Sequence, residues 1–397
     1  KRLSDGANLY KLPSSLKLRS LIRMPLQHLL FCYLFSVCAL FAKSATSEVA
    51  SMVLVPGGTF LMGGDAGLMG GNSQSHNSSY PIHEVTIDPF WMDTTEVTNR
   101  QFETFVNATG YITFAERPLP KEYLERMRKM AAINLKELER AAKYAVGSEL
   151  EDICASIEQI QETAKQDGVA GAIVFTPPTH RLYNSMDETQ WWRILPSANW
   201  RSPNGEGSSI LGLEDHPVVN ITHEDAEAYA RWCGKRLPTE AEWERAARGN
   251  LIRKPYVWGD LVTPNNRWMA NIWQGTWPYE NSAEDGYLTT APVKSFLPNA
   301  FGLYDMSGNV WELVADRYWS QTYASRQNQV VVNPIGPSQE ELIALGQQTV
   351  AYVTRGGSFL CSDNWCRGYQ PGSRQSLHFD SPANHTGFRC VKEIKND

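Results

Sequence analysis

The stretch Gly234-Lys-Arg-Leu-Pro-Thr-Glu-Ala-Glu-Trp-Glu244 sets the pattern from which the fold can be read. Thr239 is followed three residues later by Glu242, which is the spacing of a capping box at the start of a helix. The predicted helix carries Trp243 and ends at Gly249. We therefore expect a short helix that is bounded by its own start and stop signals.

Similar signals recur along the chain. Thr98 and Gln101 form a second capping box, and Thr222 starts a further short helix. Apolar runs broken by glycine, at 52–64 and 83–92, predict short strands with tight turns. Short helices, scattered strands and long loops together indicate an irregular, loop-rich α+β domain.

The composition fits a folded domain with much irregular structure. The chain has 397 residues, of which 42% are hydrophobic, and this length is enough for a large core. Its 29 Gly and 22 Pro favour turns, and its 13 Trp favour aromatic packing. The net charge is -6 and no long run of Lys or Arg occurs, which argues against nucleic acid as the main partner.

Residues 24–46 predict a secretory signal peptide. Three basic residues precede an apolar run over 29–42, and small residues follow it. The run is shorter than the ~20 residues that a membrane-spanning helix needs, so no stable span is expected, and an uncleaved anchor is the alternative. We therefore expect the secretory pathway, meaning the ER lumen in a eukaryote and the periplasm or the exterior in a bacterium.

An oxidising compartment changes the meaning of the cysteines. The thiols that remain after residue 46 are Cys154, Cys233, Cys361, Cys366 and Cys390. Their odd number means that at least one stays outside a disulfide or has another task. Cys233 and Cys390 could pair, but the sequence does not fix the connectivity.

Two of these thiols lie close together in Arg355-Gly-Gly-Ser-Phe-Leu-Cys361-Ser-Asp-Asn-Trp-Cys366. Such a pair can form a disulfide, exchange thiols or hold a soft metal ion. The spacing is wider than that of the C-x-x-C redox motif, and a lone pair falls short of a four-ligand zinc site. Spacing and compartment alone favour the disulfide.

The segment 118–168 differs from the rest of the chain, because charge is dense and Gly is almost absent. Apolar residues follow a 3-4 spacing on both sides of Gly147, over 124–145 and 150–160. This pattern predicts a helical hairpin with one apolar stripe on each helix. The hairpin packs as an insertion on the main body or, alternatively, serves as a lid or a partner-docking element.

Several phrases together resemble the formylglycine-generating enzyme family, whose domain is also called the sulfatase-modifying factor domain. They occur in family order between about residues 52 and 392, with the helical segment left out. They include Met52-Val-Leu-Val-Pro-Gly-Gly, Met92-Asp-Thr-Thr-Glu-Val-Thr-Asn, the 234–244 stretch, Asn299-Ala-Phe-Gly-Leu-Tyr-Asp-Met-Ser-Gly-Asn-Val-Trp-Glu312, Arg355-Gly-Gly-Ser-Phe and Gly387-Phe-Arg-Cys390. The resemblance implies an irregular single domain over 48–393, related to C-type-lectin-like folds, with the helical segment 118–168 inserted in it.

The resemblance also implies an activity. Such enzymes are copper-dependent oxidases that use O2 to convert a cysteine in a C-x-P-x-R segment of an unfolded sulfatase into Cα-formylglycine. Cys361 and Cys366 match the two copper(I) ligands, and a soft ion of this kind accepts thiolates in low-coordinate geometry. Ser358 matches a serine close to the reacting thiols, Trp311 a tryptophan that lines the oxygen pocket, and Arg374 an arginine of the substrate groove.

The resemblance implies two structural calcium ions as well, and they would stabilise the long loops. Carboxylate and carbonyl oxygens on loops are the ligands that Ca2+ takes. The first ion would be held by the side chains of Asn271 and Asp285 and the backbone oxygens of Ile272 and Tyr287. The second would be held by Asp305, Glu312 and the backbone oxygens of Gly308 and Val310, with Glu96 as a candidate further ligand.

Two positions depart from the family pattern. Ser362 stands where family members often have His after the first metal thiol. The family cysteine that pairs with the counterpart of Cys390 is often at the position of Ala230, whereas Cys233 lies one helical turn later on the same face. A shifted disulfide is therefore an open alternative.

Two other classes of protein stay open. A non-catalytic paralogue, which binds sulfatases or other partners on the same scaffold, would lose a thiol, but this chain keeps both. A different oxidase of the superfamily, such as a non-haem iron enzyme, would need a cluster of histidines, and the eight His show no H-x-x-x-H grouping.

Overall fold

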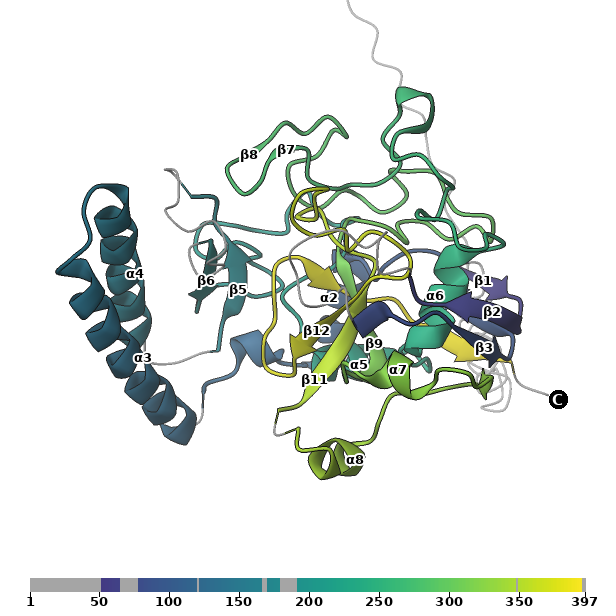
Figure 1. Ribbon diagram of the computed structural model, residues 1–397, viewed down its shortest axis with the longest axis horizontal. Helices are drawn as coiled ribbons and strands as arrows, with labels where there is room; N and C mark the ends of the chain where they lie inside the picture. The colour runs from purple at the N-terminus through teal and green to yellow at the C-terminus, as the bar shows by residue number, and fades with distance from the viewer. Residues whose placement is uncertain are drawn as a thin grey trace, which may run out of the picture. The chain divides into compact units, whose positions relative to one another are not determined.

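The computed structural model describes residues 51–64, 78–119, 121–165, 170–178, 191–347 and 349–394. The predicted signal peptide at 24–46 lies outside these ranges. Within them, no helix is long and apolar enough to cross a membrane. Residues from Met52 onward form one unit by their contacts, which Figure 1 shows.

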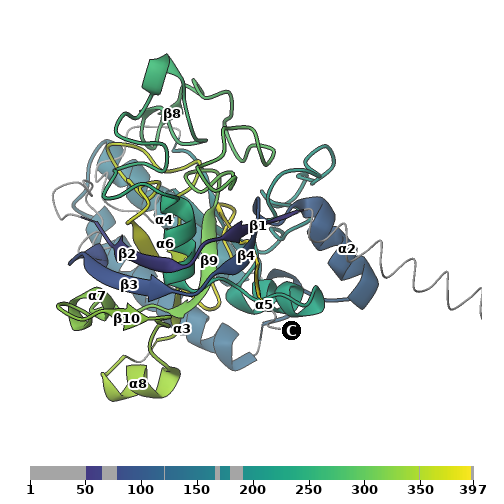
Figure 2. The ribbon, with the colours of Figure 1, turned by 90° about the vertical axis from the view of Figure 1, so that its right-hand side faces the viewer.

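The strands are short and are distributed along the whole unit. They are β1 (Met52–Val55), β2 (Gly58–Met62), β3 (His83–Ile87), β4 (Phe90–Asp93), β5 (Ala172–Phe175), β6 (Trp192–Leu195), β7 (Gly275–Thr276), β8 (Glu280–Asn281), β9 (Trp311–Arg317), β10 (Val331–Val332), β11 (Ala351–Arg355), β12 (Arg374–His378), β13 (Thr386–Gly387) and β14 (Val391–Glu393). The largest sheet has the order β12-β11-β9-β13, and the other sheets in the described residues have two or three strands. Figure 2 shows β1 to β4 beside β9, as short ribbons rather than one continuous sheet.

The helices are also short, except for one pair. They are α2 (Asn99–Thr109), α3 (Lys121–Ala142), α4 (Ser148–Lys165), α5 (His223–Trp232), α6 (Glu240–Arg248), α7 (Thr322–Ser325) and α8 (Gln339–Ala344), with 3-10 turns η2 (Phe114–Glu116) and η4 (Pro264–Asn266). The predicted capping boxes are confirmed, because the Thr98 hydroxyl accepts from the Gln101 amide (3.3 Å) and the Thr239 hydroxyl from the Glu242 amide (3.2 Å). The loop-rich α+β class that the sequence predicted is thus confirmed.

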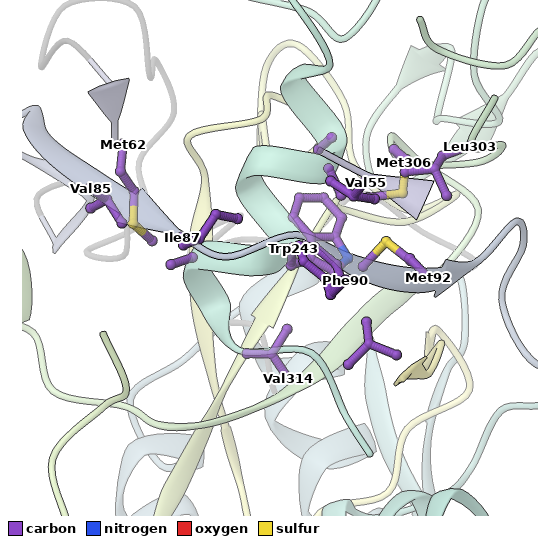
Figure 3. Close-up of a cluster of buried hydrophobic side chains, with 14 of the residues drawn as sticks. Val55, Met62, Val85, Ile87, Phe90, Met92, Trp243, Leu303, Met306 and Val314 are labelled. Carbon is purple, nitrogen blue, oxygen red and sulfur yellow. The ribbon is translucent and has the colours of Figure 1, made fainter. Parts of the chain in front are cut away.

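An apolar cluster surrounds α6 (Figure 3). Trp243 is fully buried there among side chains from several strands and loops, including Phe90 of β4 and Val314 of β9. Its indole Nε1 donates to the Glu312 carboxylate at 2.8 Å, which satisfies the one polar atom of the ring. The stretch 234–244, through Trp243 of α6, therefore provides the centre of this apolar cluster.

Ion pairs tie α6 to the largest sheet. Glu240 accepts from Arg374 of β12 at 2.7 Å and from Arg355 of β11 at 3.1 Å. Glu244 accepts a second bond from Arg355 at 2.5 Å. All four side chains are buried, and removing one partner of such a pair strands an uncompensated charge in the core. The sheet that frames the thiol segment is thus fixed to α6 by charge as well as by apolar packing.

Helices α3 and α4 occupy the stretch that predicted a helical hairpin. They pack mainly on each other, and α4 also contacts β6. At the base of the hairpin, the Ala170 amide donates to the Arg117 carbonyl and the Gly171 amide to the Ala115 carbonyl, both at 3.0 Å. The chain therefore leaves the body and returns to it at one point, and Figure 1 shows the two helices projecting beside β5 and β6.

Candidate active site

The segment between β11 and β12 carries the two neighbouring thiols. The Cys361 amide donates to the Ser358 carbonyl at 2.9 Å and the Cys366 amide to the Ser362 carbonyl at 3.1 Å, so consecutive turns fold the loop back on itself. Cys361 is 1% exposed and Cys366 is half-buried. Both side chains belong to one apolar cluster that includes Trp311 at the start of β9. The fold thus brings the expected copper ligands and the expected oxygen-pocket tryptophan together.

Gly368 makes this close approach feasible. A Cβ at this position would lie 2.3 Å from the Trp311 ring and 3.0 Å from the Cys361 sulfur. The first distance is too short for a real side chain and the second is tighter than most Cβ contacts, so the backbone at 368 itself forms one wall of the thiol cluster. Any larger residue would push the tryptophan and the thiol apart.

Ser358 lies at the base of the first turn of the loop. It is fully buried, and its hydroxyl accepts from the Leu360 amide at 3.2 Å. Gly357, directly before it, has φ +72°, and a Cβ there would lie 2.4 Å from the Tyr369 nitrogen, so only glycine fits. The Gly-Gly-Ser sequence therefore anchors the loop, and a direct role of the Ser358 hydroxyl at the thiols stays a prediction.

Arg374 lies elsewhere than the sequence suggested. Its guanidinium is buried, makes two hydrogen bonds to Glu240 at 2.7 and 3.0 Å, and donates to the Trp319 carbonyl at 3.0 Å. Burial and the bidentate ion pair commit this side chain to the core. Its surroundings argue against the expected position in a substrate groove.

A set of hydrogen bonds beneath the thiol loop, centred on Tyr369, was not predicted from the sequence. The buried Tyr369 hydroxyl donates to Asp363, a residue of the loop itself, at 2.9 Å. Asp363 also pairs with Arg367 at 3.2 Å, and the Ser307 hydroxyl holds the Tyr369 carbonyl at 2.8 Å. The tyrosine that follows the second thiol was the available signal, but a loop without regular period does not reveal that it meets Asp363, and Ser307 is distant in sequence.

Aromatic side chains flank the loop on two sides. On one side Tyr369 stacks on Tyr256, with ring centroids 6.1 Å apart, and Tyr256 stacks on Trp258 at 5.1 Å. On the other side Trp365, which lies within the loop, stacks on Trp277 at 6.1 Å, and Trp277 stacks on Phe175 of β5 at 5.1 Å. The loop thus takes part in two separate aromatic groups, which we call the Tyr369 stack and the Trp365 stack.

The residues expected at the first calcium ion converge. The Asp285 carboxylate accepts from the Ile272 amide at 2.9 Å and from the Tyr287 amide at 3.0 Å. The Gln274 amide nitrogen contacts the Ile272 carbonyl and, at 2.8 Å, the Asp285 carboxylate. The Asn271 Oδ1 atom is buried without a hydrogen-bond partner, which leaves an oxygen that a cation could satisfy. This set of hard oxygens fits Ca2+.

The acids expected at the second calcium ion form a buried cluster around Arg389. Glu312 is held at both oxygens by Arg389, each at 2.7 Å, whereas the Glu96 Oε2 atom is 3.9 Å from Arg389 and has no hydrogen-bond partner. Burial raises the pKa of Glu96 well above its usual range and that of Asp305 to about 6. Three carboxyl groups share one guanidinium, and a cation bound beside them would favour their charged forms.

The acid side chains alone do not make a finished metal site. Among the described residues, no three His, Cys, Asp or Glu side chains are grouped so that they could hold an ion. Either expected calcium ion would therefore depend on backbone oxygens in addition to carboxylates. The first position fits such a mixed set, because the Ile272 carbonyl and the Asp285 carboxylate meet at Gln274 and the Asn271 Oδ1 atom has no partner.

A second pair of cysteines meets at the end of α5. The Cys390 thiol is buried and shares a hydrogen bond with the Cys233 thiol, and burial followed by this bond raises the pKa of Cys390. Lys235 and Asp93 form an ion pair at 2.9 Å beside them. The two cysteines that the sequence suggested as partners are thus neighbours, and Cys154 is exposed on α4.

Comparison with known proteins places the chain in a family. Residues 37–394 match the sulfatase-modifying factor enzyme 1-like domain. The chain is 37% identical to the formylglycine-generating enzyme of Thermomonospora curvata, over 88% of this chain and 96% of that protein. It is 35% identical to the formylglycine-generating enzyme of Mus musculus, over 87% of this chain and 76% of that protein.

Two further matches are a relative named as inactive and a solved structure. The inactive C-alpha-formylglycine-generating enzyme 2 of Mus musculus is 36% identical over 86% of this chain and 85% of its own length. The solved structure of PvdO from Pseudomonas aeruginosa covers 86% of this chain and 94% of its own, with 20% identity and a TM-score of 0.48. The chain belongs to the sulfatase-modifying factor enzyme 1-like family, as its motifs predicted.

Proposed function

We propose that this protein is a formylglycine-generating oxidase. Its substrate is a cysteine in a C-x-P-x-R segment of an unfolded sulfatase, its oxidant is O2 and its metal is copper(I). The observation that carries the proposal is the placement of Cys361 and Cys366 together against Trp311 in an apolar cluster. The similarity to proteins named formylglycine-generating enzyme, over most of their length, supports the same conclusion.

The residues at the loop fit copper(I). Two thiolates are soft ligands that suit this ion at low coordination number, and they leave room for a substrate thiolate. Copper bound there would supply the oxidising chemistry with O2 that amino-acid side chains lack. The described residues contribute no third His, Cys, Asp or Glu ligand at this point.

The surrounding side chains shape the site for a peptide. Cys361 is the inner thiol and Cys366 the outer one, because the first is buried and the second half-buried. Trp311 and the backbone at Gly368 cover the inner thiol and exclude water from it. A substrate cysteine would therefore approach from the side of Cys366 and Trp365, where the half-exposed indoles offer apolar surface.

The first test is conversion of a C-x-P-x-R peptide by the copper-loaded protein in air. Mass spectrometry should show that the peptide loses sulfur and gains oxygen. Cys361→Ser and Cys366→Ser should abolish conversion, whereas Cys154→Ser, which changes the exposed thiol on α4, should leave it unchanged. Absence of product with the wild-type protein would overturn the proposal.

A second candidate is a non-catalytic paralogue that binds sulfatases. The similarity to the mouse protein named as inactive is the observation that favours it. This alternative predicts that the protein binds the unfolded sulfatase peptide but never converts it, even with copper and a reductant. Binding measured by fluorescence anisotropy, together with the mass of the peptide, separates the two candidates.

Calcium and the compartment belong to the same proposal. Two Ca2+ ions would hold the loops around Asp285 and around Asp305, and chelation should then lower the melting temperature. Asp285→Asn should remove most of the calcium-dependent part of that change, because the carboxylate would lose its charge but keep its shape. We place the protein in the secretory pathway, where expression with and without residues 24–46 tests whether that segment directs export.

A further inference from the structure

The inner thiol of the site is closed off from solvent, although the reaction proposed for it needs electrons from outside. Written in balance, R–CH2–SH, one O2, two electrons and two protons give R–CHO, one hydrogen sulfide and one water. The substrate thus supplies only part of the electrons that O2 takes up. Cys361 is 1% exposed and Trp311 is 4% exposed, so a reductant in solution does not reach the inner thiol directly.

The Tyr369 stack leads from this thiol toward the surface. Tyr369 is 1% exposed, belongs to the same cluster as Cys361 and follows Gly368, where an added Cβ would lie 3.0 Å from the sulfur. The rings of Tyr369 and Tyr256 are inclined by 12°, and those of Tyr256 and Trp258 by 6°. Trp258 at the outer end is only partly buried. Three parallel rings therefore connect the buried thiol with solvent.

The residue types in this stack are those that carry electrons. Phenol and indole rings are the side chains most easily oxidised by one electron, and electrons pass between neighbouring rings more readily than through aliphatic packing. Hydrogen bonds fix both ends of the stack, since Tyr369 donates to Asp363 and Trp258 Nε1 donates to the Leu261 carbonyl at 2.7 Å. The Trp365 stack differs, because its parallel contacts run from Trp277 onto Phe175, whose ring is hard to oxidise, and its contacts with further indoles are edge-on.

We infer that Tyr369, Tyr256 and Trp258 form an electron path that supplies the thiol site from a thiol reductant in solution. The inference rests on the proposed oxidase function. In each step Tyr369 gives one electron to the site and its hydroxyl proton moves along the hydrogen bond to Asp363. Tyr256 and then Trp258 refill the ring, and the proton returns. Two solution thiols replace the electrons at Trp258, release two protons and form one disulfide, which completes the balance of one turnover.

The first test is turnover with a thiol reductant. Tyr256→Phe keeps the ring and the packing but removes the oxidisable phenol, so turnover should fall about tenfold with the KM for the peptide unchanged. The copper(I) affinity, measured by competition with a chelator, should stay the same. Trp232→Phe on α5, an indole that is 43% exposed and belongs to neither stack, is the matched control and should leave both turnover and KM unchanged. Equal turnover in wild type and Tyr256→Phe would overturn the inference.

The second test identifies where the oxidising equivalent goes when the reductant is limiting. Peptide mapping by mass spectrometry should find oxidised Trp258 in the copper-loaded wild-type protein after turnover. In Tyr256→Phe this product should decrease and oxidation should increase at Tyr369 or Trp311 instead. If Trp258 is oxidised to the same extent in both proteins, the rings do not form a path.

A third measurement separates failure of the path from failure of the oxidase proposal. The metal-free protein is photo-oxidised from outside with ruthenium tris-bipyridine, and tyrosyl radicals are detected by electron paramagnetic resonance. The part of the signal that Tyr369→Phe removes should also be missing in Trp258→Phe, which keeps both tyrosines but lacks the entry point. If Trp258→Phe retains that signal, the path is wrong, whether or not the wild-type protein makes formylglycine.

Discussion

The α3–α4 hairpin and the loop that carries Cys361 and Cys366 are held in opposite ways. The hairpin packs mainly on itself and is joined to the body by two backbone hydrogen bonds at its base. The loop is held by Trp311 and Ser307, which are distant from it in sequence, and by the ion pairs that fix β11 and β12 to α6. Changes beneath the loop should therefore spread through the body, whereas changes in the hairpin should stay local.

The largest effect should come from the ion pairs under the sheet. Glu240→Ala leaves Arg374 buried without its carboxylate and deprives Arg355 of one of its two, which should cost about 3–5 kcal/mol of unfolding free energy. Urea unfolding followed by circular dichroism measures this. Glu227→Ala, which removes an exposed pair with Arg231, is the control and should cost less than about 1 kcal/mol. A small effect of Glu240→Ala would mean that these charges do not fix the sheet.

The next effect should appear at the wall of the thiol cluster. Gly368→Ala introduces a methyl group 2.3 Å from the Trp311 ring, and overpacking of this kind costs about 1–3 kcal/mol. Copper(I) affinity should fall as well, because the same methyl group lies 3.0 Å from the Cys361 sulfur. Asn364→Ala, an exposed change in the same loop, should stay within about 0.5 kcal/mol. Equal copper affinity in both variants would contradict the close packing.

A pH-dependent effect should come from Asp316, near the end of β9. Burial raises its pKa from 3.8 to about 7, so between these values the folded protein keeps a proton that the unfolded chain has lost. The contribution of this group to stability therefore falls as pH rises from about 4 to 7, by at most about 1.4 kcal/mol per pH unit. Asp316→Asn can still accept from the Glu240 amide, which now donates to the carboxylate at 2.7 Å, and cannot ionise.

The measurement for Asp316 is a series of urea unfolding curves across that range. The variant should lose the downward slope and should be the more stable protein at pH 7. If the free energy of unfolding depends on pH in the same way in wild type and variant, the pKa of the Asp316 carboxyl is not raised in the folded protein.

The smallest effect on the body should follow removal of the hairpin. We expect this for a short glycine-serine linker in place of residues 120–168. The linker would join two chain segments that the backbone hydrogen bond from Ala170 to Arg117 already holds together. The unfolding free energy of the body should change by no more than about 1 kcal/mol, since loop length has only a weak effect on closure. A larger loss would show that the hairpin covers part of the core.

The same variant tests the lid alternative. Conversion of a short C-x-P-x-R peptide should be unchanged if the hairpin is a packed insertion. Loss of conversion of a full unfolded sulfatase chain, with the short peptide still converted, would instead identify the hairpin as a docking element.

The sequence predicted those features whose signals are local. The capping boxes at Thr98 and Thr239 and the 3-4 spacing of the hairpin depend on residues within one or two turns, so they could be read without the fold. Arg374 could not be placed in this way, because its partner Glu240 is distant in sequence. The hydrogen bond between Tyr369 and Asp363 was missed for a different reason. The two residues are close in the chain, but the loop that joins them has no regular period from which their contact could be predicted.

The tryptophans around the thiol loop have a consequence for spectroscopy. Trp365 lies in ring contact with Trp191 and Trp277, and Trp277 in turn contacts Trp273. Indoles this close exchange excitation energy, so light absorbed by any of them can reach Trp365, the indole that is part of the loop. A thiolate or a metal ion at Cys366, the next residue, would quench that emission. The intrinsic fluorescence of the native protein should therefore report occupancy of the loop without any added label.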